Sequence, residues 1–498
     1  MTYTVQEASL TGIADAIRTK TKSEERLTFP DGFVEAIGSI KTGGGAAVAE
    51  KDVNFYDYDG ALIAAYTEDE AKVLQELPTP PEHDGLTFQG WNYTLDEVHT
   101  YAEAADVGAL YTTDDGKTKI YIDVGERKDV QLKLAQTLPK GVIVDWGDGV
   151  SKKSWNSTNA PLTFSHTYDN PGSYVITIQV LGECTITLGG GSNCLIDSAQ
   201  TYSQEMAVTI RRICIGDGVK ALAIRAFSSC YDLETLSIPE SVAQISAEAM
   251  KSCRRLKHVT FPSAVTNIES RVFLDCSNLA SVSLGPHIQE FSDAFTDCSS
   301  LRQIIVAGEY DVQENCVGAF SGCATLQTAI MRTTSPQTRY ARNMFNGCNC
   351  LRKVFFPASV SGLGERAFCL SSLEKFEIPD SVVVDDGTVG HNFYQSYSLR
   401  ECIMGSGCTV IPRNAFDSCY RLQRIECRGD VTAVSSGAIN YCRSLKTLDL
   451  THCSSVPSLT AAWYGTPDDL QILVPAALAD EWKQATNWVA YADKIIGV

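Results

Sequence analysis

The chain has 498 residues, enough for several domains, and its 44% hydrophobic and 20% charged residues are those of an ordinary globular protein. The formal net charge of −19 argues against a nucleic-acid partner, because a phosphate backbone is bound by clustered Lys and Arg. No run approaches the ~18 uninterrupted apolar residues of a membrane span, so we expect no membrane insertion.

Residues 1–42 predict two short amphipathic helices, because apolar side chains fall at helical spacing in both halves of the segment. So short a segment buries little surface by itself. The apolar stripes therefore need a partner surface, which is another protein, other copies of this chain, or the rest of the chain if the helices dock as a hairpin. We expect a homo-oligomer of unspecified copy number. The candidate attachment or oligomerisation residues are Leu10, Ile13, Ile17, Phe33 and Ile37.

A Gly- and Ala-rich linker over residues 43–50 leads to a first β module, predicted over residues 51–106. Two alternating segments joined by an Asp-Gly pair, between residues 53 and 66, predict a hairpin. Further along, the run Asp84-Gly85-Leu86-Thr87-Phe88-Gln89-Gly90-Trp91 resembles the Gly-x-x-Phe-x-Gly-Trp strand end of small β-grasp repeats in Gram-positive surface proteins.

Residues 107–191 predict a second β module with dense alternation of β-branched residues. Its turn from Asp145 to Gly149, followed by His166 and Tyr168, resembles the polycystic-kidney-disease (PKD) type of immunoglobulin-like sandwich. Asp145 and Asp148 could ligate calcium. We favour the alternative that these carboxylates accept hydrogen bonds from the turn's amides, while His166 and Tyr168 pack across the sandwich.

Residues 200–473 repeat ten times with a period of 22 to 25 residues, in the pattern Phe-x-x-Cys-x-x-Leu-x-x-Leu-x-Ile-Pro. So regular a period indicates a stacked solenoid. Within each repeat the Leu-x-Ile end predicts a short strand, and the Phe-x-x-Cys-x-x-Leu part predicts a helical turn. The apolar anchors of the repeats are Phe227, Met250, Phe273, Phe295, Phe320, Phe345, Phe368, Phe393, Phe416 and Ile439.

Eight of the 18 cysteines stand three residues after an anchor, and serine replaces them at Ser371 and Ser396. There is no Cys-x-x-Cys pair and no histidine at ligand spacing. We therefore expect small buried side chains at this position rather than disulfides, metal ligands or a cofactor site. These cysteines are Cys230, Cys253, Cys276, Cys298, Cys323, Cys348, Cys419 and Cys442.

The repeats resemble the BspA-like leucine-rich repeats of bacterial and protozoan surface proteins and of many phage tail proteins. Residues 474–498, with Trp482, Trp488 and Tyr491, resemble the closing element of such arrays and predict a helix that covers the last strand. The expected fold is thus multidomain and mainly β. It contains short N-terminal helices, two small β modules, and a solenoid of about ten repeats with a C-terminal helical cap.

We expect no enzymatic activity. The seven histidines are scattered through different modules, and neither a His-Glu-x-x-His nor a Gly-x-Ser-x-Gly motif occurs. Because carboxylates are plentiful, a pair at glycosidase separation stays open as an alternative.

Two surfaces of the solenoid compete as ligand-binding candidates, each with an ordinary solvated face as the alternative. One is the turn edge just after the cysteine position, where aromatic and arginine side chains could stack on sugars or anchor a protein. Its candidates are Tyr231, Tyr397, Tyr420 and Arg443. The other is the outward side of the strands, where apolar residues among charges are typical of recognition. Its candidates are Ile305, Lys353, Phe355, Lys375, Ile403 and Arg424, and alternation also places Ser237, His258, Thr260 and Ser283 there.

The segment of residues 8–33 resembles a short N-terminal element of tail-associated proteins in phages that infect Gram-positive bacteria. The N-terminal residues show no signal peptide. The resemblance implies a phage tail receptor-binding protein, assembled in the host cytoplasm and carried in the virion. Its N-terminus would bind other tail proteins, and its repeats would bind a host-surface glycan or protein. The alternatives are an architectural tail or baseplate protein with no receptor role, and a bacterial cell-surface adhesin.

Overall fold

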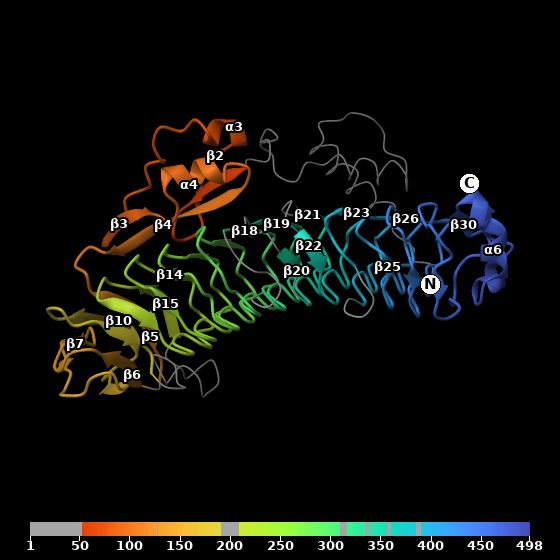
Figure 1. The fold of residues 1–498 in the computed structure, drawn as a ribbon. Helices are drawn as coiled ribbons and strands as arrows, with labels where there is room; N and C mark the ends of the chain where they lie inside the picture. Colours follow the sequence, from red (N-terminus) through yellow and green to blue (C-terminus); the bar gives the residue numbers. More distant parts are fainter. Residues whose placement is uncertain are drawn as a thin grey trace, which may run out of the picture. The chain divides into compact units, whose positions relative to one another are not determined.

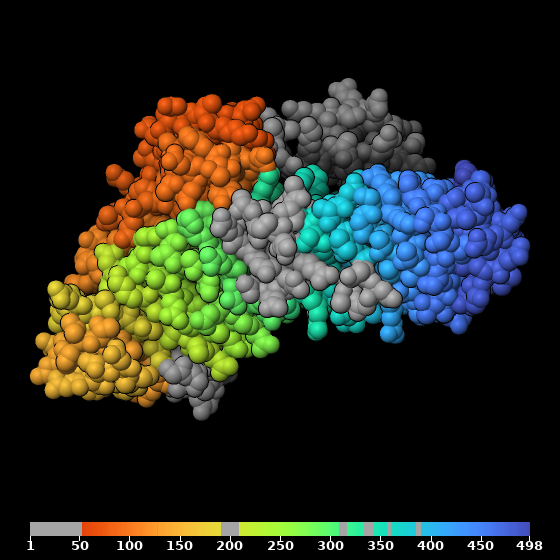
Figure 2. Space-filling model, in the orientation of Figure 1, coloured from red at the N-terminus to blue at the C-terminus, as the bar shows by residue number. Residues whose placement is uncertain are grey.

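The computed structural model divides the chain into two compact units, Met1–Lys51 and Asp52–Val498. The residues that it describes are 52–126, 128–190, 209–308, 316–333, 338–340, 342–355, 360–384 and 390–498. The predicted N-terminal helices and linker lie outside the described residues, as do the five attachment candidates Leu10, Ile13, Ile17, Phe33 and Ile37. Figures 1 and 2 show the second unit in colour.

The first sheet module covers residues 52–113 and has four strands in the order β2-β1-β4-β3. The predicted hairpin is confirmed, because β1 and β2 pair antiparallel around Gly60, and β1 also pairs in parallel with β4. The elements are β1 (Val53–Tyr56), β2 (Leu62–Tyr66), α3 (Glu68–Ala71), β3 (Leu86–Trp91), α4 (Leu95–Thr100) and β4 (Ala105–Thr113).

Both short helices of this module begin at a capping box. The Thr67 and Thr94 hydroxyls accept hydrogen bonds from the amides of Glu70 and Glu97, whose carboxylates accept from the threonine amides in return. The module's core is separate and small, and it is centred on Phe55. Because β4 belongs to this sheet, the module boundary that we predicted between residues 106 and 107 falls inside a strand, and the break comes after Thr113.

The sandwich, residues 118–188, contributes strands to two sheets. One contains β5, β10, β7 and β8, and the other contains β11, β6 and β9. Its strands are β5 (Thr118–Val124), β6 (Asp129–Gln136), β7 (Val142–Asp145), β8 (Ser151–Lys153), β9 (Leu162–Thr167), β10 (Gly172–Val180) and β11 (Ile186–Leu188).

Both sheets of the sandwich continue into the repeats. The strand β5 pairs antiparallel with β12 (Thr209–Cys214), and β11 pairs in parallel with β13 (Val219–Leu222). These in turn pair in parallel with β14 (Thr235–Ser237) and β15 (Gln244–Ile245). A single hydrophobic core therefore runs from Ile120 to Ile495. The sandwich covers the first turn of the solenoid, whose strand edges would otherwise be open to pairing with other chains.

Within the solenoid all described strand pairs are parallel. Figure 1 shows the repeats stacked from green to blue. The outward-facing ladder continues with β16 (His258–Thr260), β17 (Ser281–Ser283), β18 (Gln303–Gly308), β19 (Thr328–Thr333), β21 (Lys353–Phe355), β23 (Lys375–Ile378), β24 (Glu401–Met404), β26 (Arg424–Cys427), β28 (Thr447–Asp449) and β30 (Gln471–Val474). A second ladder has β20 (Thr338–Tyr340), β22 (Val360–Leu363), β25 (Val410–Ile411), β27 (Ala433–Val434) and β29 (Ser458–Leu459).

The segment predicted as a helical turn forms consecutive hydrogen-bonded turns with three-residue steps. The Cys230 amide donates to the Phe227 carbonyl, and the Leu233 amide donates to the Cys230 carbonyl, each at 3.1 Å. A longer helix is prevented because the residues two before and two after each anchor have positive φ, as at Arg225 (60°) and Ser229 (62°). The residues with positive φ therefore end each run of three-residue turns after a few residues.

The anchors and cysteines stack as the repeat pattern predicts. Neighbouring anchor rings lie parallel, with centroids 5.4 Å apart for Phe273 and Phe295. The cysteine thiol of one repeat donates to the anchor carbonyl of the repeat before it, at 3.2 Å from Cys298 to Phe273. Ser396 makes the same contact at 3.0 Å with Phe368, which explains why serine replaces cysteine there.

The predicted C-terminal cap is confirmed as a short helix with flanking turns. The side chains of Trp482 and Trp488 are fully buried, and the Trp488 indole donates to the Pro457 carbonyl at 2.7 Å. One further strand, β31, pairs in parallel with β30. The cap contains η2 (Ala476–Leu478), α6 (Ala479–Gln484), η3 (Trp488–Tyr491) and β31 (Ile495–Gly497).

None of the helices in the described residues has the length and apolar character needed to cross a membrane.

Candidate functional site

The first sheet module covers the outward face of the early repeats. Its strand β4 contacts β14, β16, β17 and β18, and Figure 1 shows the module beside these strands. The Ser237 hydroxyl donates to the Tyr111 carbonyl at 2.8 Å, and the Asn92 amide donates to the Ser283 carbonyl at 3.1 Å. The prediction that four outward residues of these strands face solvent is therefore wrong. All are buried: Ser237, His258, Thr260 and Ser283.

The prediction for Ile305 is wrong for the same reason. Its side chain is only 3% exposed, because β4 contacts β18, the strand that carries Ile305. Alternation places the side chain outward as expected, but that side is occupied by another part of the chain. Ile305 is thus part of a contact between modules and not part of a free binding surface.

This contact contains two buried titratable groups of opposite kind. Burial raises the pKa of Asp106 to about 7, although hydrogen bonds from Asn54 and Gln303 oppose the rise. Burial lowers the pKa of His258 to about 4, so its imidazole is neutral near pH 7. At the rim of the contact, the His287 ring lies 2.9 Å from the Glu97 carboxylate.

From β21 onward most outward side chains of the strands are accessible, and we call this surface the open strand face. Lys353 and Phe355 begin it, and Phe355 is 50% exposed. Figure 2 shows the later repeats, coloured blue, free of the first sheet module. The open strand face consists of Lys353, Phe355, Lys375, Glu377, Glu401, Arg424, Glu426, Thr447 and Asp449.

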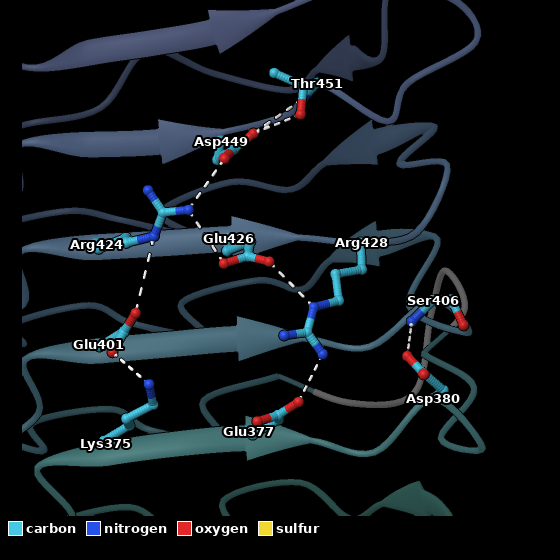
Figure 3. Close-up of polar contacts among 10 residues, drawn as sticks. All are labelled: Lys375, Glu377, Asp380, Glu401, Ser406, Arg424, Glu426, Arg428, Asp449 and Thr451. Atoms are coloured by element: carbon cyan, nitrogen blue, oxygen red, sulfur yellow. Dashed lines mark hydrogen bonds and ion pairs between the residues drawn. The ribbon is translucent and has the colours of Figure 1, made fainter.

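A network of ion pairs joins successive strands of the open strand face (Figure 3). Arg424 lies at its centre, 3.1 Å from the Glu426 carboxylate, 3.2 Å from that of Asp449 and 3.8 Å from that of Glu401. Glu401 also pairs with Lys375 at 2.8 Å. These contacts hold long side chains in fixed positions on a rigid sheet.

The ion pairs of the network favour the charged forms of Glu426 and Arg424. Burial alone would raise the pKa of Glu426, but hydrogen bonds from Arg424 and Arg428 outweigh it and lower the pKa. The hydrogen bond to Glu426 raises the pKa of Arg424. Because the pairs are partly exposed, each contributes ~1 kcal/mol or less to stability. Their main effect is therefore on the order of the side chains.

Ile403 does not belong to the open strand face, and its predicted exposure is wrong. The side chain is 5% exposed, and the strand register places it between Glu377 and Glu426. Both carboxylates pair with Arg428, at 2.6 and 3.1 Å, so these ion pairs cross β24 (Figure 3). By the strand register, Ile403 lies where they cross. The alternating strand pattern did not predict a role for Arg428, because this residue stands directly after the end of β26.

The turn edge carries two separate clusters. Near the sandwich, the Arg254 guanidinium lies 5.1 Å from the Tyr231 ring and pairs with Asp275 at 2.8 Å. In the later repeats, the rings of Tyr397 and Tyr420 stack at 5.3 Å with an angle of 18° between them. The Arg443 guanidinium lies 5.3 Å from the Tyr420 ring. All four predicted turn-edge residues are exposed: Tyr231, Tyr397, Tyr420 and Arg443.

Next to the second cluster lies a pocket of about 220 Å³ that the sequence analysis missed, which we call the arginine pocket. It is lined by Arg400, Arg421, Gln423 and Ser444. The first two are exposed. A sequence signal for this pocket exists, because Arg400 and Arg421 each stand next to the regularly spaced leucine of their repeat, Leu399 and Leu422.

In the Asp-rich turn of the sandwich, the two carboxylates accept hydrogen bonds from backbone amides of the turn, as we expected. The Asp145 carboxylate accepts from the Gly147 amide at 2.8 Å, and the Asp148 carboxylate accepts from the Val150 amide at 3.1 Å. The His166 ring stacks on Trp146 and lies 2.6 Å from Asp148. In the described part of the chain, no three His, Cys, Asp or Glu side chains are grouped as metal ligands would be.

Cys350 is exposed, whereas the cysteines that follow the anchors are buried. Burial raises the pKa of the Cys276 and Cys323 thiols to about 12, so both stay protonated near pH 7.

Comparison with known proteins identifies the repeats. The family described as BspA type leucine rich repeat region matches residues 200–327, 292–388 and 340–462, which together span just over half of the chain. No curated protein matches the chain.

Several solved structures are similar at low identity. A leucine-rich repeat protein from Bacteroides ovatus is 18% identical with a TM-score of 0.35, over 60% of this chain and 97% of its own. A leucine rich cell surface protein from Faecalibacterium prausnitzii is 22% identical with a TM-score of 0.33, over 54% and 67%. The pneumococcal vaccine antigen PcpA is 15% identical with a TM-score of 0.34, over 57% and 66%.

Proposed function

The chain belongs to the BspA type leucine-rich repeat family, and on that premise we propose that it is a non-catalytic, adhesin-type recognition protein that binds a surface ligand through its later repeats. The observation that carries the proposal is the open strand face. The early repeats are covered by the first sheet module, whereas the later ones present an accessible, ordered surface.

The chemistry of the open strand face suits recognition of a surface ligand. Phe355 offers half of its ring to solvent beside the exposed Lys353, and charges held by mutual ion pairs continue along β23 to β28. Side chains that are already ordered lose less conformational entropy on binding. An exposed aromatic residue next to fixed charges is typical of an interaction hot spot.

Two kinds of protein could have this recognition function, and different observations support each of them. Family membership supports a protein of the bacterial cell surface, where repeats of this type occur. The phage tail carrier needs, in addition, the resemblance of residues 8–33 to tail-associated proteins. We therefore favour the cell-surface adhesin and keep the phage tail receptor-binding protein as the second candidate. Detection of the chain on uninfected cells supports the first, and detection only in purified virions supports the second.

Adsorption of the labelled full chain to Gram-positive cells tests the proposal, with Phe355→Ser as the informative variant. Loss of the ring contact should raise the Kd about tenfold, because burying such a side chain is worth ~1.5 kcal/mol or more. Val73→Ser is the matched control, since Val73 is 67% exposed in the first sheet module. Unchanged binding by Phe355→Ser, or equal weakening by both variants, contradicts a role for the open strand face.

A further inference from the structure

Three exposed arginines lie on consecutive repeats, between the turn edge and the start of the strands: Arg400, Arg421 and Arg443. In the described residues, no carboxylate stands within ion-pair distance of any of them. Several other arginines of the solenoid are paired, as Arg424 is with Asp449 and Arg254 is with Asp275. In a chain with a net charge of −19, three neighbouring uncompensated cations mark a local surface suited to anions.

The fold sets the spacing of these cations. The Gln423 amide donates to the Arg400 carbonyl at 2.8 Å, and the Lys446 amide donates to the Gln423 carbonyl at 2.9 Å. Successive repeats are thus stacked as neighbouring rungs, about 4.8 Å apart. The three arginines occupy different positions of their repeats and lie on three successive rungs along the solenoid axis, which matches a polymer with repeated charges better than a single small anion.

The residues around the three arginines add directed hydrogen-bonding groups. The arginine pocket places the Gln423 amide and the Ser444 hydroxyl beside Arg400 and Arg421. The tyrosine stack holds the Arg443 guanidinium against the Tyr420 ring, which limits its motion. Guanidinium groups bind phosphate and carboxylate through paired hydrogen bonds, and hydroxyl and amide groups suit the alcohols of a sugar.

We propose that the arginine pocket, together with Arg443, binds an acidic polysaccharide through its phosphate or carboxylate groups. This surface is distinct from the open strand face, where Arg424 and Arg428 are already paired with acids. Phosphate and carboxylate polymers share the required chemistry. The chain therefore has two binding surfaces in its later repeats, one of mixed character and one for polyanions.

The test measures binding of immobilised full chain to a poly(glycerol phosphate) teichoic acid, to polygalacturonate and to neutral dextran. We expect binding to one or both acidic polymers, none to dextran, and weakening as salt rises from ~0.05 to ~0.5 M. The double variant R400Q/R421Q should raise the Kd at least tenfold, since a hydrogen bond to a charged group is worth ~1.5–3 kcal/mol. The polymer that binds identifies the anion.

The matched control is R302Q/R352Q. Arg302 and Arg352 are exposed and precede β18 and β21 as Arg400 precedes β24, so the charge change is the same. Equal losses in the two double variants would mean unspecific attraction and would overturn the proposal, as would unchanged binding by R400Q/R421Q. Tighter binding of poly-glutamate than of any polysaccharide also overturns it. If cell adsorption depends on Phe355 while R400Q/R421Q binds polymers normally, only this inference fails.

Discussion

At the scale of single residues, position in the repeat fixes the direction of a side chain but not its surroundings. Ile305, Phe355 and Ile403 occupy outward positions of their strands. Phe355 is half exposed, Ile305 lies on a strand that β4 contacts, and Ile403 lies where the ion pairs of Arg428 cross β24. The same alternation thus has three outcomes, because the sequence of one repeat does not specify what lies above it.

Asp106 gives a residue-scale prediction of pH dependence. Its pKa is raised to about 7 from 3.8, so the stability it contributes is complete below pH 4 and is lost as the pH rises to about 7. We expect Asp106→Asn to unfold like the wild type near pH 4 and to be more stable at pH 8, by up to ~4 kcal/mol. Urea unfolding of both proteins at each pH measures the difference.

Comparison at equal pH cancels the opposite contribution of His258, whose lowered pKa removes stability as the pH falls from 6.5 towards 4. A constant stability difference between the two proteins at all pH values would show that Asp106 titrates normally.

At the scale of elements, the shape of each repeat depends on backbone positions of positive φ, which the apolar pattern of the sequence does not mark directly. Residues of positive φ stand two before and two after every anchor, and they include Gly318 and Gly322 as well as Leu370 and Asn414. Because several residue types occupy these positions, no single residue type marks them in the sequence. The three-residue hydrogen-bonded turns between them are what the Phe-x-x-Cys-x-x-Leu spacing predicts.

The contact between β4 and the repeats gives an element-scale prediction. A Cβ added at Gly108 would lie 2.3 Å from the Thr260 hydroxyl and 2.8 Å from Ser283, so Gly108→Ala should push β4 off the strands. We expect faster amide hydrogen exchange in residues 105–113 and 258–283, and no change in residues 401–474. Gly172→Ala is the control, because its nearest contact would be an ordinary 3.5 Å. Unaltered exchange in Gly108→Ala contradicts the close contact.

At the scale of the whole second unit, the solenoid is closed at both ends by unlike elements. The sandwich extends both sheets at one end, and the tryptophan-rich cap covers the other. Nearest-neighbour stacking makes such ends necessary, since an uncovered strand edge pairs with other molecules. The sandwich is therefore a structural part of the repeat domain, and binding experiments need the full chain.

Removal of the cap tests this closure. Deleting residues 475–498 should expose β30 and the apolar surface beneath Trp482 and Trp488, and the shortened chain should self-associate. Light scattering against concentration measures the association. Lys483→Gln, which changes a surface residue of α6 without touching the tryptophans, should stay like the wild type. A shortened chain that behaves as the full one does would show that the cap is dispensable.

The sequence by itself determined the solenoid, the anchor and cysteine stacks, the hairpin and the cap. It did so because each depends on residues that are local or recur at a fixed period, such as Phe273 and Cys298. Only the tertiary structure decided which repeats are accessible. That depends on the contact between β4 and four distant strands, and on Arg428 crossing β24. It also brought Arg400, Arg421 and Ser444 to one pocket. Contacts between modules of different sequence have no period, so no pattern along the chain reports them.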